Sequence, residues 1–261
     1  MDPTFNLGDF DVTPTSYRQC LLQSIRSGNS PVLIGPTLIH YRKTFHTYLF
    51  FASTLVGLRR DLQALRAFGT DGEKALADAF SHEFRYAIHL TCFIHCRQNI
   101  KRELQELGFS DTARMEILKD IFGHQEGNTF SEGLVDCMDE NDFNEKLEIA
   151  KGHWAELEKS DGAKSGFYSW FVQNKVNSMK ATMLKTVRAE AGLGSPPQPF
   201  TTNASETTNS VIKAHVKYAH SQLMEFVNHL KDVVDEKNVK WSVLLSNGAS
   251  SDLRKNIHIW K

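Results

Sequence analysis

Three acidic residues, far apart along the chain, have the type and the setting of ligands for divalent metal ions. Asp2 lies in DPTFNLGDF, Asp71 in GTDGEKAL and Glu206 in TTNASETTNSVIK, each where a strand or a helix is expected to begin or end. Mg²⁺ is a hard cation that prefers oxygen ligands. Two such ions about 4 Å apart activate a water and stabilise the leaving oxygen in phosphodiester cleavage. The order Asp, Asp, Glu therefore predicts a two-metal site for phosphoryl transfer.

Each of these acids also has a purely structural interpretation. Asp71 stands in an Asp-Gly pair before a helix, which is typical of a turn or a helix cap. Asp2 beside the terminus is typical of a solvated acid. Glu206 follows Asn203 by three residues, the spacing of a capping box or of a first-turn acid that faces the helix dipole. The metal hypothesis therefore depends on the three acids taken together.

A fourth pattern, Cys92-Phe-Ile-His95, has ligand spacing that zinc can use. A structural zinc site needs four ligands, and the available partners are Cys96, His124 and Cys137. The alternative is that Cys92 packs at a strand end while His95 caps a helix or hydrogen-bonds near the acids. The spacing alone leaves both interpretations open.

The composition is that of an ordinary globular chain. Its 261 residues can bury the core of one large domain, or of one domain with an inserted subdomain. The net charge of -1 gives no global basic field, so any binding of nucleic acid must depend on a local basic cluster. Four scattered cysteines do not resemble a disulfide framework. The longest apolar run, 48–58, is shorter than the roughly 20 residues that cross a bilayer.

The elements that must position these residues follow from periodicity and turn signals. A first strand that holds Asp2 is expected before a turn at 7–9, and further strands are expected over 12–17, 31–39, 62–68 and 86–93. Helices are expected over 44–58, with Thr44 as the N-cap, and over 73–80 and 95–107. Only helices are expected from 110 to 192, among them one capped by Ser110 and Asp111, one over 141–157 and one over 167–191. A Gly- and Pro-rich linker over 192–199 follows, and then one long helix from 206 to about 234. The first part therefore predicts a mixed sheet with helices on its faces, an α/β arrangement.

Several side chains near the acids could meet DNA. Arg97, Lys101 and Arg102 follow His95 on one expected helix, and Lys213 and Lys217 share the helix of Glu206. They could contact phosphates, or they could form solvated helix faces. Aromatic residues over 167–171 could stack on bases, but their helical spacing is more typical of a core.

Residues 1–235 resemble the catalytic domain of Mutator-like element (MULE) transposases, a branch of the DDE transposases. The matching stretches, in order, are DPTFNLGDFDVTPTSY, GTDGEKALADAF, CFIHCRQNIKREL and TTNASETTNSVIK. The resemblance implies a ribonuclease H-like mixed sheet with flanking helices and an all-helical insertion. The implied segments are a core over 1–108, the insertion over 109–200, and a third segment over 201–261 that begins with the helix of the third acid.

The resemblance also implies functional roles. Asp2, Asp71 and Glu206 would bind two Mg²⁺ or Mn²⁺ ions, and Cys92, His95, Asn203 and Asn209 would support them. The activity would be DNA strand cleavage and strand transfer in the nucleus. The partners would be double-stranded DNA, both transposon ends and target, with homo-oligomerisation left open and no membrane.

The chain departs from the family at its start. Only Met1 precedes Asp2, so the front half of the first strand is missing, and the zinc modules common in such transposases are absent from these residues. We therefore expect a fragment or a degenerate copy of a longer transposase. The first alternative is a catalytically inactive, transposon-derived module that binds DNA or protein. The second is a ribonuclease H-like nuclease without strand transfer.

Overall fold

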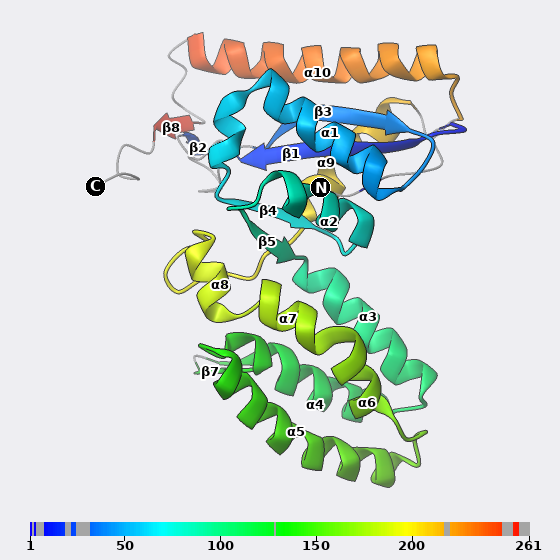
Figure 1. The fold of residues 1–261 in the computed structure, drawn as a ribbon, viewed down its shortest axis with the longest axis vertical. Helices are drawn as coiled ribbons and strands as arrows, with labels where there is room; N and C mark the ends of the chain where they lie inside the picture. The colour runs from blue at the N-terminus through cyan, green and yellow to red at the C-terminus, as the bar shows by residue number, and fades with distance from the viewer. Residues whose placement is uncertain are drawn as a thin grey trace. The chain divides into compact units, whose positions relative to one another are not determined.

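The chain forms two compact units of mixed α/β structure (Figure 1). The computed structural model describes residues 1, 3, 8–18, 22–24, 32–127, 129–216, 220–246 and 253–255. The terminal unit comprises Met1–Arg59 and Thr202–Lys261, and the central unit comprises Arg60–Thr201. The boundaries expected from the sequence lie at 108 and between 200 and 201, whereas the units divide after Arg59 and after Thr201.

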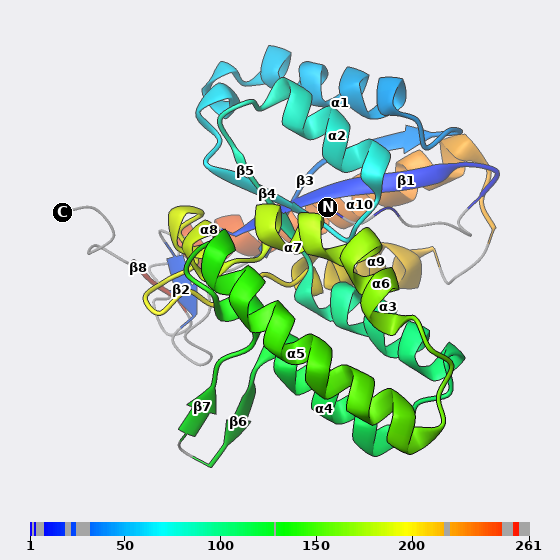
Figure 2. The same cartoon turned by 60° about the horizontal axis from the view of Figure 1, so that its bottom comes forward.

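The terminal unit is built on an antiparallel strand pair, β1 (Asp11–Arg18) and β3 (Val32–His40). Both strands were predicted. A shift in register between Pro14 and Ser16 marks a bulge in β1. Helix α1 (Phe45–Leu58) covers one face of the pair, and α9 (Asn203–His215) and α10 (Leu223–Ser246) lie on the other (Figures 1 and 2). Strands β2 (Leu22–Ser24) and β8 (Leu253–Lys255) form a second antiparallel pair.

Local sequence signals explain parts of this unit. Thr44 caps α1 as predicted, because its hydroxyl oxygen accepts a hydrogen bond from the Thr47 amide at 3.3 Å. The single helix expected from 206 to 234 is wrong, since the segment forms two helices, α9 and α10. Helices α9 and α10 share one apolar core with β1 and the residue before it. This core consists of Phe10, Val12, Ile212, Val216 and Phe226.

The central unit begins with a parallel strand pair, β4 (Ala67–Thr70) and β5 (Ile88–Thr91). Each strand leads into a helix, α2 (Lys74–Glu83) after β4 and α3 (Phe93–Glu106) after β5. The strand expected over 62–68 is wrong in its first half, where Arg60–Ala64 forms a 3₁₀ helix. That segment reads RDLQA and lacks the β-branched and aromatic residues that favour strands.

The remainder of the central unit is mostly helical. Its helices are α4 (Asp111–Phe122), α5 (Glu140–Asp161), α6 (Phe167–Phe171), the π-helix Val172–Val176, α7 (Asn177–Thr182) and α8 (Lys185–Glu190). Ser110 caps α4 as predicted. The expectation of helices alone is wrong, because β6 (His124–Glu126) and β7 (Thr129–Ser131) form a hairpin, followed by the 3₁₀ turn Leu134–Asp136 (Figure 2). The helix expected to run through 167–191 is broken into shorter pieces.

Trp154 lies at the centre of the core of this helical part. Its ring centroid is 5.2 Å from those of both Phe167 and Phe171, and all three side chains are buried. The indole Nε1 donates to Asp120 Oδ2 at 2.9 Å, which satisfies the polar atom of a buried ring. Phe167 and Phe171 are therefore core residues, as the helical spacing favoured, and do not present a stacking face to bases.

Two general features of the fold are relevant to function. The α/β class is confirmed, while the ribonuclease H-like arrangement stays a prediction, because the hydrogen-bonded strands of the described segments pair two by two. None of the helices in the described part of the chain is long and apolar enough to cross a membrane.

Candidate functional site

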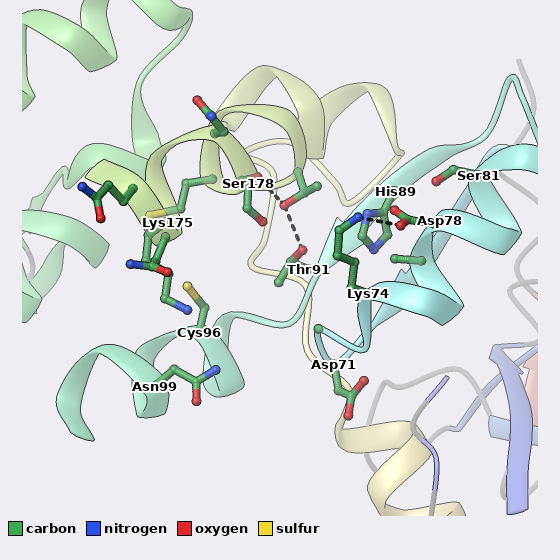
Figure 3. Close-up of a pocket in the computed structure, with 17 residues that line it drawn as sticks. Asp71, Lys74, Asp78, Ser81, His89, Thr91, Cys96, Asn99, Lys175 and Ser178 are labelled. Carbon is green, nitrogen blue, oxygen red and sulfur yellow. Dashed lines mark hydrogen bonds and ion pairs between the residues drawn. The ribbon is translucent and has the colours of Figure 1, made fainter. Parts of the chain in front are cut away.

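A polar cavity of about 780 Å³ opens in the central unit, beside the carboxyl ends of β4 and β5 (Figure 3). Asp71 directly follows β4, and Thr91 is the last residue of β5. In open α/β sheets, ligands bind outside the carboxyl ends of parallel strands, where the adjacent helices also begin. The cavity lies at the corresponding end of this two-stranded pair.

Asp71 lies half-buried at the rim of this cavity. Its Oδ1 accepts a hydrogen bond from the Glu73 amide at 3.3 Å, and Gly72 supplies the positive φ of 115° that the turn requires. Asp71 thus makes the turn contact expected of an Asp-Gly pair before a helix. Asp71 also lines the cavity, so the turn does not exclude a binding role.

One wall of the cavity comes from α2 and β5. Lys74 and Asp78 pair at 2.6 Å along α2 (Figure 3). His89 Nε2 lies 2.9 Å from Thr70 Oγ1, and the ring stacks on Phe68 with centroids 5.0 Å apart. Burial lowers the pKa of His89 to about 4, so the ring is neutral at physiological pH and does not add a positive charge to the cavity.

The opposite wall comes from the π-helix and α7 (Figure 3). Residues that line it with polar side chains are Gln173, Asn174, Lys175, Asn177 and Ser178. Single π-helical turns inside α-helices occur often at functional sites. The Thr182 hydroxyl is hydrogen-bonded to that of Thr91 over 3.0 Å, which joins α7 to the end of β5. Amides, hydroxyls and lysines on two facing walls suit a polar or anionic ligand.

The cysteines near the cavity do not form a metal site with the partners proposed from the sequence. Cys92 is buried immediately before α3, and its carbonyl accepts from the Cys96 amide. Burial raises the pKa of Cys96 to about 11 and that of Cys137 to about 12, so both thiols are protonated at neutral pH. In the described part of the chain, neither Cys92 nor His95 belongs to a cluster of three possible metal ligands. The positioning role of these two residues stays a prediction.

Glu206 lies in the first turn of α9, in the terminal unit. Its Oε1 accepts a hydrogen bond from Thr202 Oγ1 at 3.2 Å, and Ser205 contacts Ser16 of β1 over 3.0 Å. Thr202 occupies the cap position, so the alternative of a capping box built on Asn203 is wrong. Asn203 is exposed, whereas Asn209 is buried in α9.

The convergence of the three acids stays a prediction. Asp71 belongs to the central unit and Glu206 to the terminal unit, while Asp2 lies outside the described residues. Each described acid is near the start of a helix and is at least partly accessible, as a metal ligand must be.

The predicted DNA-contacting residues differ in their exposure. Arg97 is half-buried, and its guanidinium lies 5.7 Å from the centre of the Phe122 ring. Lys101 and Arg102 are exposed on α3. Lys213 is half-buried in the last turn of α9, and Lys217 lies outside the described residues. Lys101 and Arg102 are therefore the most accessible of this set.

One cluster of possible metal ligands was not predicted from the sequence. His215, His229 and Asp232 offer ligand atoms that all lie within 4.8 Å of one another. The spacing of His229 and Asp232 along one helix is a weak signal, but only the fold brings His215 to them.

A search with models of known protein families finds no match to this chain, and a search of curated proteins finds none either.

Proposed function

We propose that this chain is a transposase-like catalytic domain with a ribonuclease H-like fold, which cleaves a DNA strand and joins the freed 3′-hydroxyl to target DNA. The proposal derives from the order of the four sequence motifs. The observation that supports it most strongly is the position of Asp71, which directly follows a parallel strand and lines a polar cavity. In this proposal the protein acts in the nucleus on double-stranded DNA.

Asp71, Glu206 and Asp2 would hold two Mg²⁺ or Mn²⁺ ions. The chemistry of the donor set fits, since Asp71 and Glu206 offer partly accessible carboxylate oxygens, the ligands that these hard cations prefer. When bound, such a pair activates the attacking hydroxyl and stabilises the leaving oxygen.

Other residues of the chain would orient these acids and the substrate. The Glu73 amide fixes one oxygen of Asp71, and Thr202 fixes one oxygen of Glu206. These two hydrogen bonds orient the carboxylates of Asp71 and Glu206. Lys175 and the amides of the facing wall would bind phosphate oxygens of the strand.

The test is nicking of supercoiled plasmid DNA in Mg²⁺ or Mn²⁺, together with transfer of an oligonucleotide 3′-end into the plasmid. Metal-ion catalysis is worth several kcal/mol, so Asp71→Asn and Glu206→Gln should each slow nicking by at least about 100-fold. Asp78→Asn is the matched control, because Asp78 lines the same cavity but pairs with Lys74. It should retain activity.

The results of the nicking and strand-transfer assays distinguish the proposed transposase from the alternatives. Nicking by Asp71→Asn at the wild-type rate would contradict the proposed site. Nicking without strand transfer would assign a nuclease, and DNA binding without either reaction would assign an inactive, transposon-derived binding module.

A further inference from the structure

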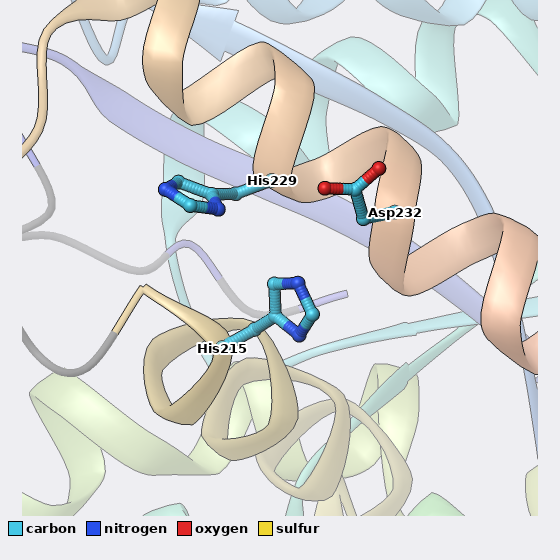
Figure 4. Close-up of side chains that lie close together, drawn as sticks. All are labelled: His215, His229 and Asp232. Atoms are coloured by element: carbon cyan, nitrogen blue, oxygen red, sulfur yellow. The ribbon is translucent and has the colours of Figure 1, made fainter.

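His215, His229 and Asp232 form a cluster on the terminal unit that the proposed DNA chemistry does not use. Their nearest ligand atoms lie within 4.8 Å of one another. Figure 4 shows His215 projecting from α9 toward His229 and Asp232 on α10. The two histidines are half-buried and Asp232 is exposed, so an ion in solution can reach all three.

The packing of two helices brings these residues together. His229 and Asp232 are three positions apart on α10, and side chains at that spacing lie on the same helix face. His215 lies in the last turn of α9. Ile212 and Phe226 belong to one apolar core, which holds the two helices side by side. The ring centroids of His215 and His229 are 5.8 Å apart and nearly perpendicular, at 73°.

The donor set selects a class of metal. Imidazole nitrogens suit transition metals, whereas Mg²⁺ prefers an all-oxygen shell. Two histidines and one carboxylate are three ligands, and zinc sites with three protein ligands keep a fourth position for water or a substrate. We propose that His215, His229 and Asp232 bind one Zn²⁺ ion, with water in the fourth position.

A neighbouring acid fits this assignment. Glu225 lies one turn before His229 on α10, with its Oε1 3.8 Å from His229 Nε2. A histidine that binds metal usually donates its other ring N–H to a carboxylate or a carbonyl, which orients the ring. With the ion on Nδ1 of His229, Glu225 would accept a hydrogen bond from the Nε2–H once the 3.8 Å separation shortens.

The ion would join α9 to α10. Its first consequence is a more stable terminal unit, because an ion that binds only the folded state raises the free energy of unfolding. Its second consequence is to fix the far end of the helix whose first turn carries Glu206. The inference does not depend on the proposed transposase activity, because it needs only these side chains.

The experiment is isothermal titration of the metal-free chain with Zn²⁺, followed by Co²⁺ substitution. We expect one Zn²⁺ per chain at this cluster and a visible Co²⁺ absorption typical of tetrahedral coordination. His215→Gln and His229→Gln should each weaken Zn²⁺ binding by at least about tenfold. Asp232→Asn should also weaken binding, and because Asp232 is exposed this variant should fold normally.

Two controls locate the ion. His46→Gln alters an exposed histidine of α1 in the same unit, and His95→Gln tests the Cys92–His95 pair. Both should bind Zn²⁺ as the wild type does. The melting temperatures of all variants in EDTA should match that of the wild type, which shows that only metal binding has changed. Wild-type Zn²⁺ affinity in His229→Gln and Asp232→Asn, or loss of binding in His95→Gln alone, would overturn the proposal.

Discussion

The guanidinium of Arg188 meets the carboxylate of Asp136 at 2.7 Å, with both side chains almost fully buried in the central unit. Arg188 also donates to the carbonyls of Val135 and Pro197. The second oxygen of Asp136 accepts from the Gly133 amide at 3.1 Å. The pair therefore joins α8 to the 3₁₀ turn before α5, and its charges are compensated inside the core.

Arg188→Met should destabilise the protein strongly. The substitution keeps much of the side-chain volume but leaves the Asp136 carboxylate buried without its cation. Breaking a buried ion pair by removing one partner costs about 3–5 kcal/mol. Urea unfolding followed by tryptophan fluorescence measures the change, because Trp154 is buried in the same unit.

An ion pair on the surface of the same unit provides the control. Lys185 pairs with Glu132, also at 2.7 Å, but both side chains are about a third or more exposed. Exposed pairs are worth about 0–1 kcal/mol. Lys185→Met should therefore cost far less than Arg188→Met, and equal costs would show that burial does not determine the strength of these pairs.

The sequence predicted elements best where a local cap or a strong period marks them. Thr44 and Ser110 stand at the starts of α1 and α4, and their hydroxyls make the expected cap hydrogen bonds. The parallel strand β5 and the helix that follows it were expected within a few residues of where they lie. These features depend on neighbouring residues, which is why one sequence suffices to predict them.

The remaining features depend on contacts that are distant in sequence. No glycine or proline marks the break after α7, where Met183 and Leu184 are both buried. The π-helix Val172–Val176 contains only residues that an α-helix would also accept. His215 and His229 come together because two helices pack, which periodicity along one helix does not reveal. Asp71 was selected by its motif, but the cavity beside it is formed by α7, about a hundred residues later.

The stability of the central unit should depend on pH through His89. Burial lowers the pKa of His89 from 6.5 in the unfolded chain to about 4 in the folded one. Between these values the unfolded chain binds a proton that the folded chain does not, so stability falls as the pH falls. From about pH 7.5 to about pH 5 the loss should be about 2 kcal/mol.

His89→Gln isolates this contribution. Glutamine can still hydrogen-bond Thr70 but does not titrate, so the variant should lose less stability over the same pH range. The measurement is the free energy of unfolding in urea for both proteins at each pH. Identical pH profiles would show that His89 is accessible to protons in the folded state.

Lys101 and Arg102 should contribute to DNA affinity without sequence preference. Both are exposed on α3, which begins two residues after β5. Removing one side chain that binds a phosphate should reduce the slope of log affinity against log salt by about 1. Fluorescence anisotropy with duplex DNA at several salt concentrations should therefore show a shallower slope for Lys101→Ala/Arg102→Ala. Lys159→Ala, an exposed lysine near the end of α5, is the control and should leave the slope unchanged.

Mg²⁺ or Mn²⁺ should raise the melting temperature through Asp71. An ion present at ten times its dissociation constant stabilises the folded state by about 1.4 kcal/mol, which is several degrees for a chain of this size. Asp71→Asn removes a ligand charge beside the cavity and should abolish that gain, while Asp78→Asn should keep it. His229→Gln should also keep it, because the histidine cluster prefers Zn²⁺ to Mg²⁺. A gain that survives in Asp71→Asn but disappears in His229→Gln would place the divalent ion on α9 and α10 and remove the main support for phosphoryl transfer at Asp71.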